Sequence, residues 1–178
     1  MNDYGVLTAP DTLRLERILP GPLERVWKYL TDSDKRATWL AAGNVEQQVG
    51  GKVDHTFRNS ELSPAHDIPP PKYSDCAGDV PMLGKITACE PLRLLSYIWN
   101  VGSDEESEVS FELAPHNDAV KLTVTHRRLT SANGRLSVAA GWHTHLNILR
   151  DVLAGKTPEG FWKVHTQLEQ DYIERLAG

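Results

Sequence analysis

Histidines are the residues of this 178-residue chain whose type and spacing best suit chemistry. His143 and His145 form a His-Thr-His triplet that resembles a metal-binding pair. Residues two apart on a helix point about 200° apart, so the two rings cannot hold one ion if this segment is helical. We expect His143 on the polar surface of the helix. We expect His145 toward the interior, either as a hydrogen-bonded core residue or as a polar group facing a ligand.

Two more histidines lie in phase with apolar residues on strand-like segments. His55 alternates with Val53 and Phe57, and His126 lies at the end of another alternating segment. If those faces point inward, His55, His126 and His145 line one interior, as an acid–base cluster or a metal site. A strand phase misjudged by one residue would instead turn a ring outward. No carboxylate shares the inward phase, and we predict neither a metal nor a cofactor.

Motifs for nucleophilic or phosphate chemistry are weak. The segment 153–157 (Leu-Ala-Gly-Lys-Thr) resembles the end of a phosphate-binding loop, but Arg150 stands where that motif requires glycine. We interpret it as a helix C-cap at Gly155. Cys76 has acidic neighbours, which raise the pKa of a thiol, and Cys89 is expected to pack as a small core residue.

The elements that position these residues follow from periodicity. The N-terminal half predicts a strand over 12–19, a short helix from Pro22, a second short helix ending near Trp39, and strands 45–49 and 53–57 joined by a hairpin turn at Gly50-Gly51. The C-terminal half predicts strands over 84–90, 94–99, 109–113 and 120–126, a turn at Asn133-Gly134, a long helix from Leu136 to near Gly155, and a last helix over 158–176. This order predicts an α+β fold of two layers within one domain, 1–178.

Residues 60–82 interrupt these patterns and hold five of the 11 prolines. We predict a long irregular loop there, which either forms a lid over a cavity mouth or packs against the domain. The acidic run 104–108 is a solvated turn or a contact for a basic partner.

Composition excludes several classes of protein. The net charge of −5 disfavours nucleic-acid binding, which requires a basic surface. We expect no signal peptide and no membrane span, and therefore a cytoplasmic protein with two reduced thiols. The sequence leaves a homodimer open.

Several segments together resemble a known family. They are Leu15-Glu16-Arg17, residues 22–31 (Pro-Leu-Glu-Arg-Val-Trp-Lys-Tyr-Leu-Thr), Trp39-Leu40, Gly50-Gly51, Gly84-Lys85-Ile86, residues 90–99, and Gly141-Trp142 with Leu146 and Leu149. Over residues 12–154 the chain resembles the START-like helix-grip superfamily, also called SRPBCC. Within it, the chain is similar to the family of homologues of the activator of the heat-shock protein 90 ATPase.

This resemblance implies a curved antiparallel sheet of about seven strands around a long C-terminal helix, with two short helices after the first strand. The loop 60–82 and the helix 158–176 are then elaborations. Relatives use the cavity between sheet and helix for lipids, polyketides or other apolar molecules. We therefore predict a small apolar or amphipathic ligand, such as a lipid, a polyketide or an aromatic metabolite, bound by His55, Phe57, Trp99, His126, Trp142 and His145.

Two other functions stay open. One is an enzyme of the cyclase, dehydratase or hydrolase type, with His145 as the candidate general base. The other is an interaction protein that acts on a chaperone ATPase. No universal catalytic residue is transferred by the resemblance, so binding without catalysis is the favoured hypothesis.

Overall fold

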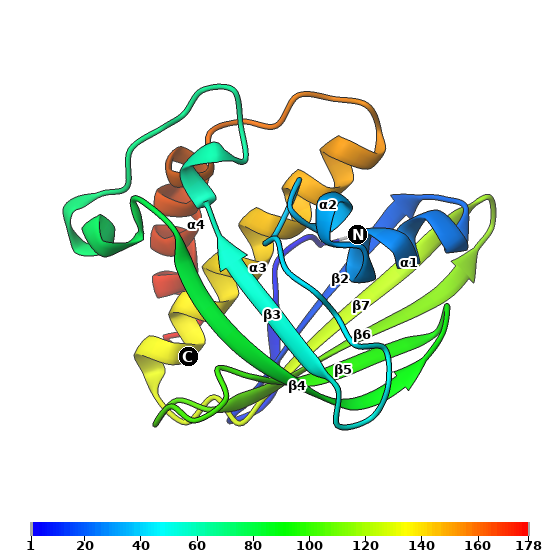
Figure 1. Ribbon diagram of the computed structural model, residues 1–178. Helices are drawn as coiled ribbons and strands as arrows, with labels where there is room; N and C mark the ends of the chain where they lie inside the picture. The colour runs from blue at the N-terminus through cyan, green and yellow to red at the C-terminus, as the bar shows by residue number, and fades with distance from the viewer. Residues whose placement is uncertain (1, 178) are drawn as a thin grey trace.

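An antiparallel sheet of seven strands forms one layer of the structure, a computed structural model that describes residues 2–177 (Figure 1). The strands follow the spatial order β1-β2-β7-β6-β5-β4-β3. Their bounds are β1 Val6–Ala9, β2 Thr12–Pro20, β3 Lys52–Phe57, β4 Val80–Glu90, β5 Leu94–Trp99, β6 Ser107–His116 and β7 Ala119–Arg127. The α-helices are α1 Leu23–Thr31, α2 Ser33–Arg36, α3 Ala132–Leu153 and α4 Phe161–Arg175, and two 3-10 helices are η1 Asn59–Glu61 and η2 Pro71–Cys76.

The sheet curves around α3, and the two together form the predicted α+β helix-grip fold (Figure 1). Leu13 and Leu15 of β2 are fully buried and stand opposite His126 and Val124 of β7. Because side chains alternate along a strand, this register turns His126 inward with its apolar neighbours. The predicted strand phase of His126 is confirmed.

The short helices α1 and α2 connect β2 to β3 at the far edge of the sheet (Figure 1). The apolar face of α1 buries Val26, Trp27 and Leu30. The Asp32 carboxylate accepts two backbone N–H groups of the first turn of α2, which satisfies donors that a helix start leaves free. The turn after α2 then buries Trp39 completely in the core.

The sequence predicts that the long helix begins at Leu136. In the structure, α3 begins four residues earlier, at Ala132. The turn predicted at Asn133-Gly134 is wrong, because both residues belong to the first turn of α3. The Ser131 hydroxyl oxygen accepts a hydrogen bond from the Gly134 N–H at 2.9 Å. This N-cap stabilises the earlier start.

Two N-terminal segments also differ from the prediction. The sequence does not predict β1, because four residues are too few to show alternation. The strand predicted over 45–49 is wrong, since Val45 forms only an isolated bridge with Val53. The N–H of Gln48 bonds to the carbonyl two residues earlier at 2.7 Å, which turns the chain out of the sheet.

The boundaries around the proline-rich segment are shifted. β4 begins at Val80, so Pro81 lies in a strand opposite Thr56 instead of in the predicted loop 60–82. The helix predicted over 158–176 is shorter in the structure, because α4 begins at Phe161 and ends at Arg175.

The loop 58–79 packs against α4 (Figure 1). The Trp162 indole N–H donates to the Ser60 hydroxyl at 2.9 Å, and the Tyr73 ring stacks on the same indole at 5.5 Å. The Tyr73 hydroxyl donates to the Glu169 carboxylate at 2.9 Å. These contacts hold the loop and α4 together as one layer outside α3.

His143 is buried, contrary to the predicted surface position, with an exposed fraction of 4%. The sequence pattern of α3 cannot show that α4 and the N-terminal segment cover this side of the helix. The Tyr172 hydroxyl of α4 accepts a hydrogen bond from the Gly5 N–H at 2.7 Å and lies 2.9 Å from His143 Nδ1. The Tyr172 hydroxyl therefore links the backbone of Gly5 to the His143 imidazole.

Replacing Tyr172 with phenylalanine is expected to destabilise the protein by about 2–3 kcal/mol, because it leaves the Gly5 N–H and His143 Nδ1 buried without a partner. Urea unfolding followed by tryptophan fluorescence measures this change. The control is Tyr29→Phe, which removes a half-buried hydroxyl that makes no hydrogen bond among residues 2–177 and is expected to cost less than about 0.5 kcal/mol. Equal stabilities for the two variants would contradict the bridging role of Tyr172.

Candidate functional site

A small cavity of about 140 Å³ lies between the sheet and the N-terminal half of α3. The ends of three strands and one face of α3 supply most of its lining. The lining residues are Leu40, Phe57, Trp99, His126, Ser137, Val138, Gly141, Trp142 and His145. Most of this wall is aromatic or apolar, which suits an apolar ligand.

The structure places five of the six predicted ligand-binding residues on this cavity. Phe57, Trp99 and His126 come from the ends of β3, β5 and β7, and Trp142 and His145 come from α3. Their rings contact one another: the centroids of Trp99 and Trp142 are 5.2 Å apart, and those of Phe57 and Trp99 are 5.9 Å apart. These edge and tilted contacts make a preformed aromatic wall.

His55, the sixth residue, lies behind this wall. Its ring stacks on Phe57 at 5.4 Å and packs against Trp99 at the same distance. Its Nε2 is 3.0 Å from the Tyr97 hydroxyl, and its Nδ1 has no hydrogen-bond partner within residues 2–177. Burial lowers the pKa of His55 well below its usual value, and the nearby Arg36 charge lowers it further. His55 therefore supports the aromatic wall in its neutral form.

The protonation of His126 follows from its two partners. The Trp142 indole N–H, which can only donate, bonds to His126 Nδ1 at 3.0 Å. Nδ1 is therefore the acceptor nitrogen and Nε2 carries the hydrogen, which it donates to the Ser107 hydroxyl oxygen at 2.7 Å. Burial lowers the pKa of His126 to about 3, in agreement with a neutral ring.

His145 shows the opposite tautomer. Its Nδ1–H donates to the Trp39 carbonyl oxygen at 2.7 Å, since a carbonyl can only accept. This leaves Nε2 as a hydrogen-bond acceptor on a residue that lines the cavity. Burial lowers the pKa of His145 to about 4, and the hydrogen bond to Trp39 opposes this shift. A neutral His145 can thus accept a hydrogen bond from a ligand.

The three histidines do not converge on one point. Each of His55, His126 and His145 is bonded to a different partner, and residues 2–177 contain no group of three or more His, Cys, Asp or Glu side chains that could hold a metal ion. The two cysteines are free and half-buried, and burial raises the pKa of both thiols.

Gly141 lines the cavity, although the sequence pointed to it only as part of a family motif and not as a ligand-binding residue. It lies inside α3, where glycine destabilises a helix by about 1 kcal/mol relative to alanine. A Cβ built there would meet no atom within 4 Å, and Ser137 and His145, one turn away on either side, line the same cavity. The absent side chain therefore keeps the cavity open. Its helical spacing from His145 was the signal in the sequence that could have identified it.

A second, more polar pocket of about 180 Å³ adjoins the cavity. The two share Trp99, Ser137 and Val138 as a common wall. The outer pocket lies where the β5–β6 turn meets the start of α3, and its further residues are Asn100, Glu105, Ser107, Arg128, Leu129, Thr130, Ser131, Asn133 and Gly134. Ser107 was not predicted as a site residue, although it precedes Val109 by two residues and so shares the inward phase.

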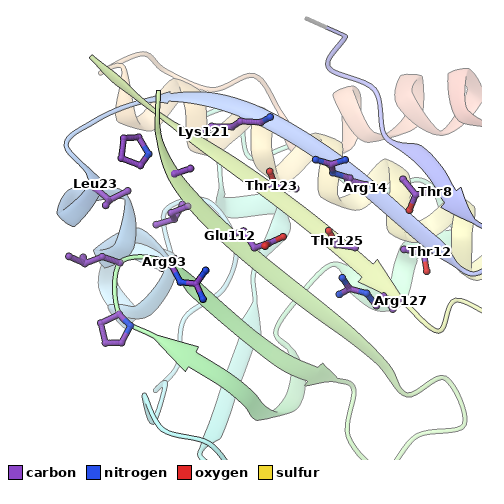
Figure 2. A pocket seen from close by; sticks show the side chains of 15 residues that line it. Thr8, Thr12, Arg14, Leu23, Arg93, Glu112, Lys121, Thr123, Thr125 and Arg127 are labelled. Carbon is purple, nitrogen blue, oxygen red and sulfur yellow. The ribbon is translucent and has the colours of Figure 1, made fainter. Parts of the chain in front are cut away.

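A wider hollow of about 960 Å³ lies on the outer face of the sheet, opposite α3 (Figure 2). Figure 2 shows Thr123, Thr125 and Arg127 spread along one strand of this face. Arg14 and Lys121 both pair with Glu16, which offsets their charge. This open, mostly charge-balanced surface does not enclose a ligand, so we place the candidate site in the aromatic cavity.

Comparisons with known proteins agree with this architecture. The family model described as "Activator of Hsp90 ATPase homolog 1-like protein" matches residues 20–154, from the end of β2 to the end of α3. The chain belongs to this family. Its match contains every residue that lines the aromatic cavity, whereas β1 and α4 lie outside it.

Solved structures of similar proteins extend the comparison. The NMR structure of the protein encoded by gene BPP1335 from Bordetella parapertussis is 39% identical, with a TM-score of 0.81, and the match covers 98% of this chain and 91% of that one. CalU16 from Micromonospora echinospora is 18% identical, with a TM-score of 0.68 and coverage of 94% and 88%. DynU16, a protein in the dynemicin biosynthetic locus, is 19% identical, with a TM-score of 0.62 and coverage of 84% and 49%. The last two show a shared fold alone.

Two further results bear on the class of protein. No curated protein matches the chain significantly. Within residues 2–177, no helix combines the length and the apolar character that crossing a membrane requires.

Proposed function

We propose that this family member binds a small, mainly aromatic molecule in the cavity between the sheet and α3. The cavity of about 140 Å³ is close in volume to engineered protein cavities of about 150 Å³ that bind benzene. A single aromatic ring therefore fits without rearrangement. Phe57, Trp99 and Trp142 offer ring faces and edges to such a ligand.

Gly141 is the observation that carries this proposal. An alanine at this half-buried position would gain about 1 kcal/mol of helix propensity without a clash, since a Cβ there meets no atom within 4 Å. Here the helix interior keeps a glycine next to open space, and that space is lined by aromatic rings and by His145, whose Nδ1 is bonded to Trp39. A binding site explains why this volume stays unfilled.

The histidines favour binding over acid–base catalysis. His126 and His145 share the cavity, so the geometry alone permits a catalytic role. However, burial lowers their pKa values to about 3 and about 4, far from the range near neutral pH in which a general base is most effective. At neutral pH the two rings act as fixed hydrogen-bonding groups.

Gly141→Leu tests the proposal, because a leucine side chain would fill the cavity while restoring a good helix former. We expect toluene to shift the indole N–H signals of Trp99 and Trp142 in ¹⁵N NMR spectra of the natural protein. We expect these shifts to fall at least tenfold in Gly141→Leu, with the thermal midpoint unchanged or higher.

The matched control is Glu174→Leu, which adds the same side chain at an exposed position of α4. It should retain the toluene response. Equal responses from Gly141→Leu and the natural protein, or no response from either, would contradict binding in this cavity.

A further inference from the structure

The outer pocket contains a buried hydroxyl donor without an acceptor. Ser107 is 3% exposed, and its oxygen accepts the hydrogen of His126 Nε2. His126 Nδ1 is already occupied by the Trp142 indole N–H, so the imidazole cannot accept a hydrogen bond from Ser107. The Ser107 hydroxyl makes no other hydrogen bond to residues 2–177. A buried donor in this state costs about 1–3 kcal/mol unless a partner reaches it.

This donor lines the outer pocket, next to the aromatic cavity. His126, to which it is bonded, lines the inner cavity, so the Ser107–His126 pair spans the boundary between the two. The half-buried indole of Trp99 is part of both walls. A ligand whose ring occupies the inner cavity would have to extend a short arm past Trp99 to reach Ser107.

The charges around the outer pocket favour an uncharged arm. Arg128 is exposed at this pocket, but Glu105 lines it as well, and Asp104 and Glu106 flank Glu105 in the acidic turn. These carboxylates oppose a second negative charge. A neutral carbonyl oxygen satisfies the Ser107 donor without this repulsion.

We propose that the natural ligand is amphipathic: an aromatic ring in the inner cavity that carries a short, uncharged arm, whose carbonyl oxygen accepts a hydrogen bond from Ser107. This inference rests on the proposed function, since it assumes that the ring occupies the aromatic cavity. It adds a specificity-determining residue, Ser107, and a ligand class, arylalkyl ketones and their amide or ester equivalents.

The test compares two probes of similar shape. 4-Phenylbutan-2-one carries a ring and a carbonyl group, and isopentylbenzene replaces the carbonyl oxygen with a methyl group. We expect Ser107→Ala to weaken binding of the ketone about tenfold and that of the hydrocarbon less than twofold, because only the ketone loses a hydrogen bond. The control is Ser96→Ala, which removes a buried hydroxyl of β5 that lines neither pocket and should leave both affinities unchanged.

A second measurement does not depend on how well Ser107→Ala folds. In the natural protein, the infrared stretch of the ¹³C-labelled ketone carbonyl should move to lower wavenumber than in a hydrocarbon solvent, because the carbonyl is hydrogen-bonded. An unshifted stretch would overturn the inference.

The two proposals fail in different ways. If both probes bind but Ser107→Ala weakens them equally, the role of Ser107 is wrong and the aromatic cavity still binds ligands. If neither probe nor toluene binds, the proposed function fails, and this inference fails with it.

Discussion

Lowering the pH from 7 to 5 is expected to reduce the free energy of unfolding by about 6 kcal/mol. Burial lowers the pKa of His126 to about 3 and the pKa values of His143 and His145 to about 4. An unfolded histidine has a pKa of about 6.5, so each of the three binds a proton more readily in the unfolded chain. At pH 5 this difference costs about 2 kcal/mol for each histidine.

The direction of this effect is fixed by the direction of the pKa shifts. Because the folded pKa values lie below the unfolded value, the contribution to stability is complete above about pH 6.5 and is lost as the pH falls toward 3–4. His55 and His165 also have lowered pKa values, from burial, and add to the loss in the same direction. A loss of this size is comparable to the whole stability of many domains, about 5–15 kcal/mol.

Urea unfolding at pH 7, 6 and 5 measures this dependence. His143→Asn removes one of the three titrating rings, and the loss between pH 7 and 5 should shrink by about 2 kcal/mol. The exposed His116 is the control position, and His116→Asn should leave the loss unchanged. A protein equally stable at pH 7 and 5 would contradict neutral, buried histidines.

The inward positions of His126 and His145 were predictable because strand and helix periodicity relate each residue to its apolar neighbours. His126 shares its strand phase with Val124, and His145 shares its helix face with Trp142 and Leu149. The register of the sheet and the packing of α3 then bring both rings to one cavity. The apolar periodicity was sufficient to predict these two positions, because it continues without interruption along β7 and α3.

The predictions were wrong or incomplete where the burial or the role of a residue depends on contacts with residues distant in sequence. His143 looks like a surface residue until α4 adds Tyr172 to that side of α3. The cavity role of Gly141 depends on empty space, which periodicity does not reveal. The free donor of Ser107 depends on the tautomer of His126, which in turn depends on Trp142. Each of these properties requires three-dimensional neighbours, so the sequence alone could supply only candidates.

Arg36 is expected to contribute strongly to stability, because it is a buried cation that joins α2, the turn after it and β3. Its exposed fraction is 1%. Its guanidinium donates to the carbonyl oxygens of Ala41 at 2.9 Å, Gly43 at 2.9 Å and Asp54 at 2.7 Å. Desolvation lowers the pKa of Arg36, but these bonds hold the charge in place.

The bonds of Arg36 also position the candidate site. They fix the turn after α2 against β3, and that turn carries Leu40, which lines the cavity, and Trp39, whose carbonyl accepts the His145 Nδ1–H. Gly43 lies in the same contact: a Cβ there would come within 2.1 Å of the Asp54 carbonyl oxygen. The close approach of two backbones therefore depends on both a glycine and a buried arginine.

Arg36→Met keeps most of the aliphatic volume and is expected to destabilise the protein by about 3–5 kcal/mol, since it leaves one buried and two part-buried carbonyl groups without their charged donor. Guanidinium chloride unfolding measures the loss, and the His145 ring signals in NMR spectra should shift because the Trp39 carbonyl is released. Lys28→Met makes a similar change at an exposed position of α1 and should cost less than about 0.5 kcal/mol. A loss for Arg36→Met no greater than that of Lys28→Met would show that the turn holds β3 without the guanidinium.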